Sequence, residues 1–218
     1  MAIHAPRANK HPVKSFKVAT VQKNKTGPYG KAAMLTPEQF DKAIDFARQH
    51  MPYGARDSLM ILLSRFCGLR AKEIATLHVR DFTDAEGKVI PELRVSKRGA
   101  KYGKERTIDL REEVVDEIKA YLKLVGIEDG PIFWTERGTP MTSNAVQKQL
   151  RTAYEGCGFK GARSHSGRRY AITTLAQRVN TIGASLDDVK IFAGHSNLET
   201  TAHYIERSPH AKKMIGLL

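Results

Sequence analysis

The sequence predicts one mostly helical α+β domain with a small antiparallel sheet. Apolar residues recur at helical spacing through most of the chain after residue 36. The spacing becomes strand-like over residues 89–110 and is helical again from residue 112. The 218 residues contain no internal repeat and no second region of different composition, and they are enough for one sizeable core. We therefore expect a single folded domain over residues 34–218.

Residues 1–33 predict a flexible basic arm that precedes this domain. The segment contains seven lysines and arginines and no acidic residue, and prolines and glycines interrupt any periodic pattern. Such an arm either lies along DNA or is a solvated leader, and the sequence favours neither alternative.

The first helix is predicted to begin after Thr36. Thr36 can cap the helix, Pro37 suits its first turn and Gln39 completes a capping box. Apolar residues then follow at helical spacing, namely Phe40, Ala43, Ile44 and Ala47. Residues 59–66 predict a buried helix that ends near Gly68, and residues 71–77 predict a further short helix.

The middle of the chain predicts two strands, Val89–Ser96 and Arg106–Leu110. A basic connection that contains glycine, residues 97–104, joins them. Helical spacing then returns in five segments, which are Glu112–Val125, Ser143–Tyr154, Ser166–Val179, Leu186–Phe192 and Asn197–Ile205.

The composition favours a polyanionic partner. The formal net charge is +13, and cationic side chains that neutralise phosphates release condensed counterions. A generic basic surface is the alternative explanation. The charge therefore favours nucleic acid as the partner and indicates no chemistry.

Nothing in the sequence points to a membrane or to secretion. No apolar run approaches the roughly 18 to 20 residues that span a bilayer. The first ten residues lack the apolar core of a secretory signal peptide. Cys67 and Cys157 are the only cysteines and form no Cys-x-x-Cys pair, which predicts reduced structural thiols. We expect a cytoplasmic, DNA-associated protein.

Several basic residues are placed to meet a phosphate. Arg70 directly follows a Gly-Leu turn and enters a predicted helix. A surface arginine that pairs with Glu73 would produce the same pattern. Lys97, Lys101 and Lys104 lie on the connection between the strands, where they either reach a nucleic-acid backbone or belong to a solvated loop.

Two histidine motifs follow in the second half of the chain. His165 and Arg168 are three residues apart, so both face one side of a first helical turn, where backbone amides favour an anion. His195 follows Gly194 in a predicted turn, and Tyr204 comes nine residues later. Taken singly, His165 is also explained as a surface histidine beside helix-capping residues, and Tyr204 as a half-buried core tyrosine.

In this order the segments resemble the catalytic domain of the tyrosine recombinase, or phage integrase, family over roughly residues 36–208. That family has an arginine in a Gly-Leu-Arg-x-x-Glu segment, a lysine on a β-hairpin and a His-x-x-Arg box. A Gly-His box then precedes the nucleophilic tyrosine by nine residues. The matching catalytic candidates are Arg70, Lys97, His165, Arg168, His195 and Tyr204, and Glu73 matches the acidic residue that supports the first arginine. The resemblance implies a fold of about seven helices with a small antiparallel sheet.

Some features depart from the family pattern. Gly167 replaces the bulky apolar residue that usually precedes the box arginine, and Arg169 stands where the family often has histidine. The hairpin connection is longer than usual. Lys97 follows its strand as the family's lysine does, so we prefer it to Lys101 and Lys104.

A further departure lies before the catalytic segments. Most family members carry a helical core-binding domain of about a hundred residues there, as large as an ordinary small domain. This chain has only its basic arm in that place. It therefore resembles short, single-domain members such as fimbrial-switch recombinases, or a shortened form.

The resemblance implies DNA cleavage and rejoining through a 3′-phosphotyrosyl intermediate. No histidines are paired at an i, i+4 spacing with a carboxylate, and no Gly-rich phosphate loop is present, so we expect neither a metal nor a nucleotide cofactor. The implied roles are phosphate binding by Arg70, Arg168 and His195, attack by Tyr204, proton removal by His165 and proton donation by Lys97. Further candidate DNA contacts are Lys72, Lys101, Lys104 and Arg169.

The implied partners are double-stranded DNA, three further copies of the chain in a homotetramer on DNA, and accessory DNA-bending proteins. Integration, excision and inversion would all use the same site. Relaxation of the type IB topoisomerase kind is an alternative that the short chain and the spacing from His195 to Tyr204 disfavour. A DNA-binding or regulatory module with decayed catalysis is another, which the intact set of six candidates disfavours.

Overall fold

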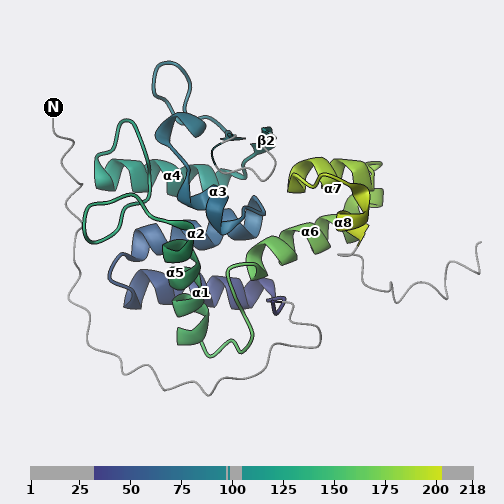
Figure 1. Ribbon diagram of the computed structural model, residues 1–218, viewed down its shortest axis with the longest axis horizontal. Helices are drawn as coiled ribbons and strands as arrows, with labels where there is room; N and C mark the ends of the chain where they lie inside the picture. Colours follow the sequence, from purple (N-terminus) through teal and green to yellow (C-terminus); the bar gives the residue numbers. More distant parts are fainter. Residues whose placement is uncertain (1–31, 97, 99–104, 203–218) are drawn as a thin grey trace, which may run out of the picture.

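The computed structural model describes residues 32–96, 98 and 105–202. It confirms a mostly helical fold with a small antiparallel sheet (Figure 1). The α-helices of the described residues are α1 (Pro37–His50), α2 (Gly54–Phe66), α3 (Ala71–Ala75), α4 (Glu112–Val125), α5 (Ser143–Gly156), α6 (Ser166–Arg178), α7 (Leu186–Ala193) and α8 (Leu198–Ala202). The strands β1 (Glu92–Val95) and β2 (Arg106–Asp109) pair antiparallel, and short 3-10 turns occur at η1 (Val79–Asp81) and η3 (Val179–Ile182).

The start of α1 has the predicted capping box. The Thr36 hydroxyl accepts a hydrogen bond from the Gln39 backbone N–H at 3.3 Å, and the Gln39 side-chain oxygen accepts one from the Thr36 N–H at 2.9 Å. Two of the backbone donors that a helix start leaves unpaired are thereby satisfied.

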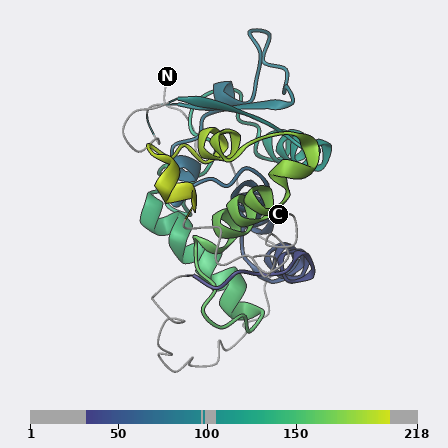
Figure 2. The same cartoon turned by 90° about the vertical axis from the view of Figure 1, so that its right-hand side faces the viewer.

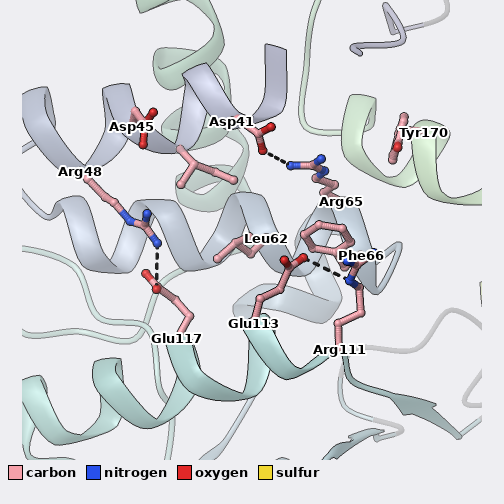
Figure 3. A pocket seen from close by; sticks show the side chains of 11 residues that line it. Asp41, Asp45, Arg48, Leu62, Arg65, Phe66, Arg111, Glu113, Glu117 and Tyr170 are labelled. Carbon is pink, nitrogen blue, oxygen red and sulfur yellow. Dashed lines mark hydrogen bonds and ion pairs between the residues drawn. The ribbon is translucent and has the colours of Figure 1, made fainter. Parts of the chain in front are cut away.

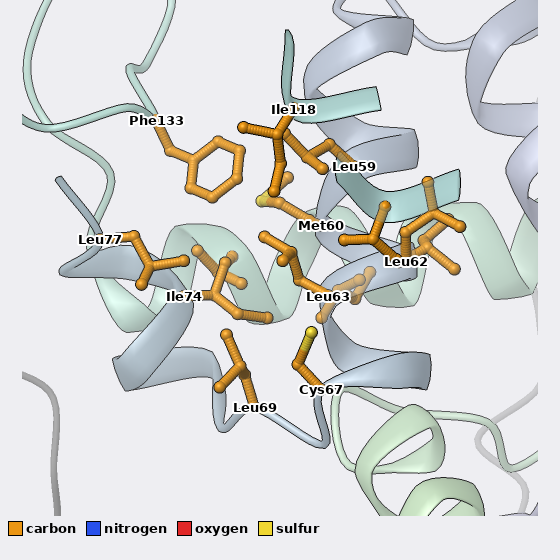
Figure 4. Close-up of a cluster of buried hydrophobic side chains, with 14 of the residues drawn as sticks. Leu59, Met60, Leu62, Leu63, Cys67, Leu69, Ile74, Leu77, Ile118 and Phe133 are labelled. Carbon is orange, nitrogen blue, oxygen red and sulfur yellow. The ribbon is translucent and has the colours of Figure 1, made fainter. Parts of the chain in front are cut away.

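The main core lies between α2 and the elements packed around it (Figure 4). Leu59, Met60 and Leu63 of α2 are fully buried, and Ile118 of α4 and Phe133 reach the same cluster. The helix is buried on nearly all sides because α1, α4, α5 and α6 all pack against it. Residues beyond its end, such as Leu69, continue into this core and hold the following turn in place.

A second, smaller cluster holds the last helices together. It contains the buried residues Ile172, Ala176, Val179, Val189 and Ala193. The start of α6 packs on α2, and the helix extends from there toward α7 and α8. Helices α7 and α8 lie at the right of Figure 1, and Figure 2 shows the molecule from that side. Helix α7 also contacts β2, so these two segments from opposite halves of the sequence meet beside α3.

Several element boundaries differ from the predicted ones. Helix α2 begins at Gly54, five residues before the predicted start at Leu59. Strand β1 begins only at Glu92, because Val89 forms an isolated bridge with Thr83 and the Ile90 N–H donates to the Phe82 carbonyl. The helix predicted over residues 197–205 is described as α8 up to Ala202, and its remainder lies outside the described residues.

A groove between α1, α2 and α4 is lined by charged side chains that pair with one another (Figure 3). The ion pairs are Arg48 with Glu117, Arg65 with Asp41 and Arg111 with Glu113. Asp45 adds a further acidic group to the lining. Because its arginines are already paired with carboxylates, this groove does not present the unbalanced positive charge that a phosphate backbone requires.

No helix in the described parts of the chain is both long enough and apolar enough to cross a bilayer.

Gly167 lies where α6 crosses α2, and its lack of a side chain permits their close approach. A Cβ atom on Gly167 would lie 2.4 Å from the Ser64 hydroxyl oxygen and 2.8 Å from the Ser64 carbonyl carbon. Both distances are far below van der Waals contact, and one of them involves the backbone of α2. Ser64 on α2 thus occupies the space into which a larger residue 167 would extend.

We expect Gly167→Ala to lower the free energy of unfolding by about 1–3 kcal/mol, the usual effect of overpacking a core. The gain in helix propensity from glycine to alanine works in the opposite direction and is smaller, about 1 kcal/mol. Urea unfolding measures the change. Gln177→Ala, at an exposed position of the same helix, is the matched control. A Gly167→Ala protein as stable as wild type would show that the α2–α6 contact can relax.

Candidate active site

Arg70 stands at the start of α3, held between two core residues. Leu69 before it and Ile74 after it are both fully buried (Figure 4). The Arg70 backbone N–H donates to Glu73 Oε2 at 2.8 Å, and its Nη1 donates to Glu73 Oε1 at 2.8 Å. The Arg70 side chain keeps 19% of its surface exposed, so part of the guanidinium remains open to a ligand.

Glu73 is a buried carboxylate with two arginine partners. Arg106 on β2 donates from Nη1 and Nη2 to its two oxygens at 3.0 and 3.1 Å, opposite Arg70. Burial alone would raise the pKa of Glu73, but the hydrogen bonds and charge of Arg106, together with those of Arg70, hold it below the usual value. Glu73 is therefore ionised in the folded protein.

Arg168 lies in the first turn of α6 and is 2% exposed. Its Nη1 donates to the Gly68 carbonyl at 2.6 Å, which ties α6 to the turn before Arg70. Gly68 has a φ of 59°, in the left-handed region that glycine adopts without strain. Arg168 thus connects the start of α6 with the turn between α2 and α3.

The last carbonyl groups of α7 each accept a hydrogen bond from a different arginine. The pairs are Phe192 with Arg106 (2.8 Å), Ala193 with Arg168 (2.8 Å) and Gly194 with Arg70 (3.2 Å). Carbonyl groups at a helix C-terminus lack partners within the helix and carry its partial negative charge, so guanidinium groups are favoured there. The end of α7 therefore draws the three arginines together.

His195 follows directly after this helix end. Gly194 ends α7 with a φ of 61°, and a Cβ there would lie 2.8 Å from Arg106 Nη1, so glycine is required both by the turn and by the neighbouring arginine. The ring is buried, with Nε2 2.9 Å from Arg168 Nη2 and Nδ1 2.9 Å from the Thr201 hydroxyl.

His165 is the N-cap residue of α6 and stays exposed. Desolvation by the surrounding protein, followed by the charges of Arg168 and Arg70, lowers the pKa of His165. A neutral imidazole beside two guanidinium groups is able to accept a proton.

The structure brings together Arg70, His165, Arg168 and His195 from three segments of the sequence. The other two catalytic candidates, Lys97 and Tyr204, lie outside the described residues, as do Lys101 and Lys104. Arg98, next to Lys97, donates to both Asp81 carboxylate oxygens at 2.8 Å and ties its part of the connection to η1.

The remaining candidate DNA contacts differ in their surroundings. Lys72 is exposed on α3, next to the site. Arg169 is partly buried, and its Nη1 donates to the Ala32 carbonyl at 2.7 Å. The described residues contain no group of three or more His, Cys, Asp or Glu side chains that could hold a metal ion.

Arg106 is a residue of this site that the sequence motifs do not reveal. The sequence pattern predicts it only as the first residue of a strand. Its side chain is 5% exposed and makes three hydrogen bonds, two to Glu73 and one to Phe192. The sequence shows only an arginine at the start of a strand that packs against the core. That pattern does not reveal which carboxylate the arginine pairs with.

We expect Arg106→Met to lower the free energy of unfolding by about 3–5 kcal/mol, because it leaves the buried Glu73 carboxylate short of a partner. Arg151→Met is the control, since its side chain is 59% exposed and pairs with Glu155 along α5, which contributes about 0–1 kcal/mol. Urea unfolding of both variants gives the comparison. Equal losses would contradict the assigned role of Arg106.

The titration of His195 predicts a pH-dependent stability. Burial, and then the charges of the neighbouring arginines, lower the pKa of His195 from 6.5 to about 4. Between these values the unfolded chain binds a proton that the folded protein does not, so protonation favours unfolding. We therefore expect the free energy of unfolding of wild type, relative to His195→Asn, to fall as pH decreases from about 6.5 toward 4.

Urea unfolding of both proteins over this pH series measures that difference. Subtracting the variant removes the contribution of Asp57, whose buried carboxyl has its pKa raised to about 6 and titrates in the same range. A difference that does not change with pH would show that the ring is not held neutral by the fold.

Comparison with known proteins shows the family of the chain. The sequence profile of the phage integrase family matches residues 33–210. A tyrosine recombinase XerC of Pelobacter propionicus is 31% identical over 155 residues, which are 70% of this chain and 48% of that protein. A tyrosine recombinase XerA of Pyrococcus furiosus is 27% identical over 186 residues, 83% of this chain and 60% of that protein. The chain thus spans about half of the length of these relatives.

Solved structures show the same fold. The crystal structure of XerA recombinase superposes with a TM-score of 0.65 at 18% identity, over 87% of this chain and 66% of that one. XerH recombinase bound to its difH substrate superposes with a TM-score of 0.66 at 20% identity, over 88% of this chain and 56% of that one. With a family profile that matches most of its length and a site that assembles residues of the family's motifs, this chain belongs to the phage integrase family of tyrosine recombinases.

Proposed function

We propose that this chain is the DNA-cleaving and rejoining domain of a tyrosine site-specific recombinase. The observation that carries the proposal is the convergence of Arg70, Arg168 and His195 around the end of α7. These are the residues of three separate family motifs. Tyr204, the proposed nucleophile, follows His195 by nine residues in the sequence.

The site suits phosphoryl transfer because positive charge is concentrated there on a rigid support. Arg70, Arg106 and Arg168 carry three positive charges, and Glu73 compensates one of them. Preorganised donors of this kind stabilise the negative charge that develops on the non-bridging oxygens of a phosphodiester. Arg70, with its partly exposed side chain, is the arginine that a phosphate would reach first.

In the proposed reaction the Tyr204 hydroxyl oxygen attacks phosphorus, and the bond from phosphorus to the 5′-oxygen breaks. Tyrosine has an ordinary pKa of about 10, so its proton must be removed, and the neutral imidazole of His165 is the proposed acceptor. Lys97 donates a proton to the leaving 5′-oxygen. The 3′-phosphotyrosyl bond conserves the energy that rejoining requires.

Double-stranded DNA is the proposed substrate, and Lys72, Lys101, Lys104 and Arg169 are proposed to contact its backbone. Similar structures include XerH bound to difH and the Tn1549 transposon integrase in complex with circular intermediate DNA. Recombination joins two duplexes at four strands, so a homotetramer on DNA is the proposed assembly, with accessory DNA-bending proteins as further partners.

We expect wild-type protein to form a denaturant-resistant adduct with nicked suicide DNA, and Tyr204→Phe to form none while still binding. The target is obtained by selecting bound duplexes from a random library with the Tyr204→Phe protein, and the selected site is then placed in the nicked substrate. Arg70→Ala should cut the single-turnover cleavage rate by about 100-fold or more, because a donor to the developing charge is lost.

Tyr53→Phe, on the loop before α2, controls for the loss of a tyrosine hydroxyl and should cleave as wild type does. Tight binding of the selected site without any adduct would overturn the proposal and favour a binding module with decayed catalysis. Relaxation of supercoiled plasmid without exchange between two sites would favour the topoisomerase-like alternative.

A further inference from the structure

Thr201 holds His195 from the side opposite Arg168. Its hydroxyl oxygen lies 2.9 Å from His195 Nδ1, while Nε2 of the same ring lies 2.9 Å from Arg168 Nη2. Thr201 on α8 is fully buried, and His195 is 7% exposed. Both ring nitrogens therefore have a hydrogen-bond partner within the protein.

These two contacts determine which nitrogen carries the proton. A guanidinium group has only donors, so Nε2 must present a lone pair to Arg168. The proton of the neutral ring then lies on Nδ1, which donates to the Thr201 hydroxyl oxygen. The lowered pKa of His195 agrees with a neutral ring at physiological pH.

We propose that Thr201 is a positioning residue that fixes the orientation of the His195 ring through its contact with Nδ1. The inference rests on the proposed recombinase function, in which His195 donates from Nε2 to a phosphate oxygen. Donation from Nε2 requires the other neutral tautomer: when a phosphate oxygen replaces Nε2 as a partner of Arg168 Nη2, one proton passes from Nδ1 to water and one passes from water to Nε2. A threonine hydroxyl both accepts and donates, so Thr201 keeps Nδ1 paired in either state.

Thr201 is also close in sequence to the proposed nucleophile. Thr201 comes three residues before Tyr204 in the sequence. The segment that leads to the proposed nucleophile therefore begins at the residue that holds the ring.

The test separates the hydroxyl from the volume of the side chain. Thr201→Val keeps the shape and removes the hydroxyl, Thr201→Ser keeps the hydroxyl, and Thr152→Val on α5 controls for the substitution itself. Thr201→Ala takes the place of the valine variant if circular dichroism shows that the latter is unfolded. All variants are made in the full chain.

The first readout is the NMR signal of the His195 Nδ1 proton in DNA-free protein labelled with ¹⁵N-histidine. We expect a downfield, slowly exchanging proton on Nδ1 in wild type, Thr201→Ser and Thr152→Val, because it is buried and hydrogen-bonded. In Thr201→Val this signal should be lost or exchange rapidly. An unchanged signal in the valine variant, or a wild-type ring protonated on Nε2, would overturn the proposal whatever the cleavage activity.

The second readout is single-turnover cleavage of the nicked substrate at saturating protein. Thr201→Val should cleave about 10- to 100-fold more slowly, the range expected when a catalytic group is slightly misplaced, with DNA affinity unchanged. Thr201→Ser should restore the rate. Equal rates for the valine variant and wild type would overturn the positioning role. Absence of any adduct with wild type would instead refute the proposed function, and the NMR result would still decide the tautomer.

Discussion

The ionised carboxylate of Glu73, fully buried between Arg70 and Arg106, is the constraint around which the site is organised. A buried charge is costly unless it is paired and hydrogen-bonded. Glu73 meets this requirement with hydrogen bonds from two guanidinium groups and one backbone N–H. The pairing joins the start of α3 to β2, two segments separated by more than thirty residues. Arg70 is thereby oriented before any ligand arrives.

The C-terminal end of α7 is the second half of the same arrangement. Its last carbonyl groups have no partner within the helix, and the arginines need acceptors. The hydrogen bonds between them satisfy both groups. Arg168 also donates to the Gly68 carbonyl, which closes a ring of contacts through the start of α6 and the turn before α3. These contacts also fix the position of His195, because His195 directly follows Gly194 at the end of α7. A site built this way presents donors at fixed places, which is what stabilisation of a developing negative charge requires.

The departures from the family pattern have structural explanations where the structure describes them. Gly167, directly before Arg168 in the first turn of α6, permits α6 to approach Ser64 of α2 closely. Arg169, in place of the usual histidine, donates to the Ala32 carbonyl and ties the first described residue to α6. Both residues adjoin Arg168 and neither displaces it.

The sequence by itself determined the fold class and the order of the elements, and it predicted four residues that the structure places in the candidate site. Helical spacing and capping residues are local properties of the chain, and motifs such as Gly-Leu-Arg or Gly-His are defined by neighbours in sequence. Tertiary structure alone decided that Arg106 shares Glu73 with Arg70, that the end of α7 gathers three arginines, and that Thr201 holds His195. These contacts join residues far apart in the chain or depend on which nitrogen of a ring faces which partner. Such pairing follows from packing distance and hydrogen-bond geometry, for which a one-dimensional pattern carries no signal.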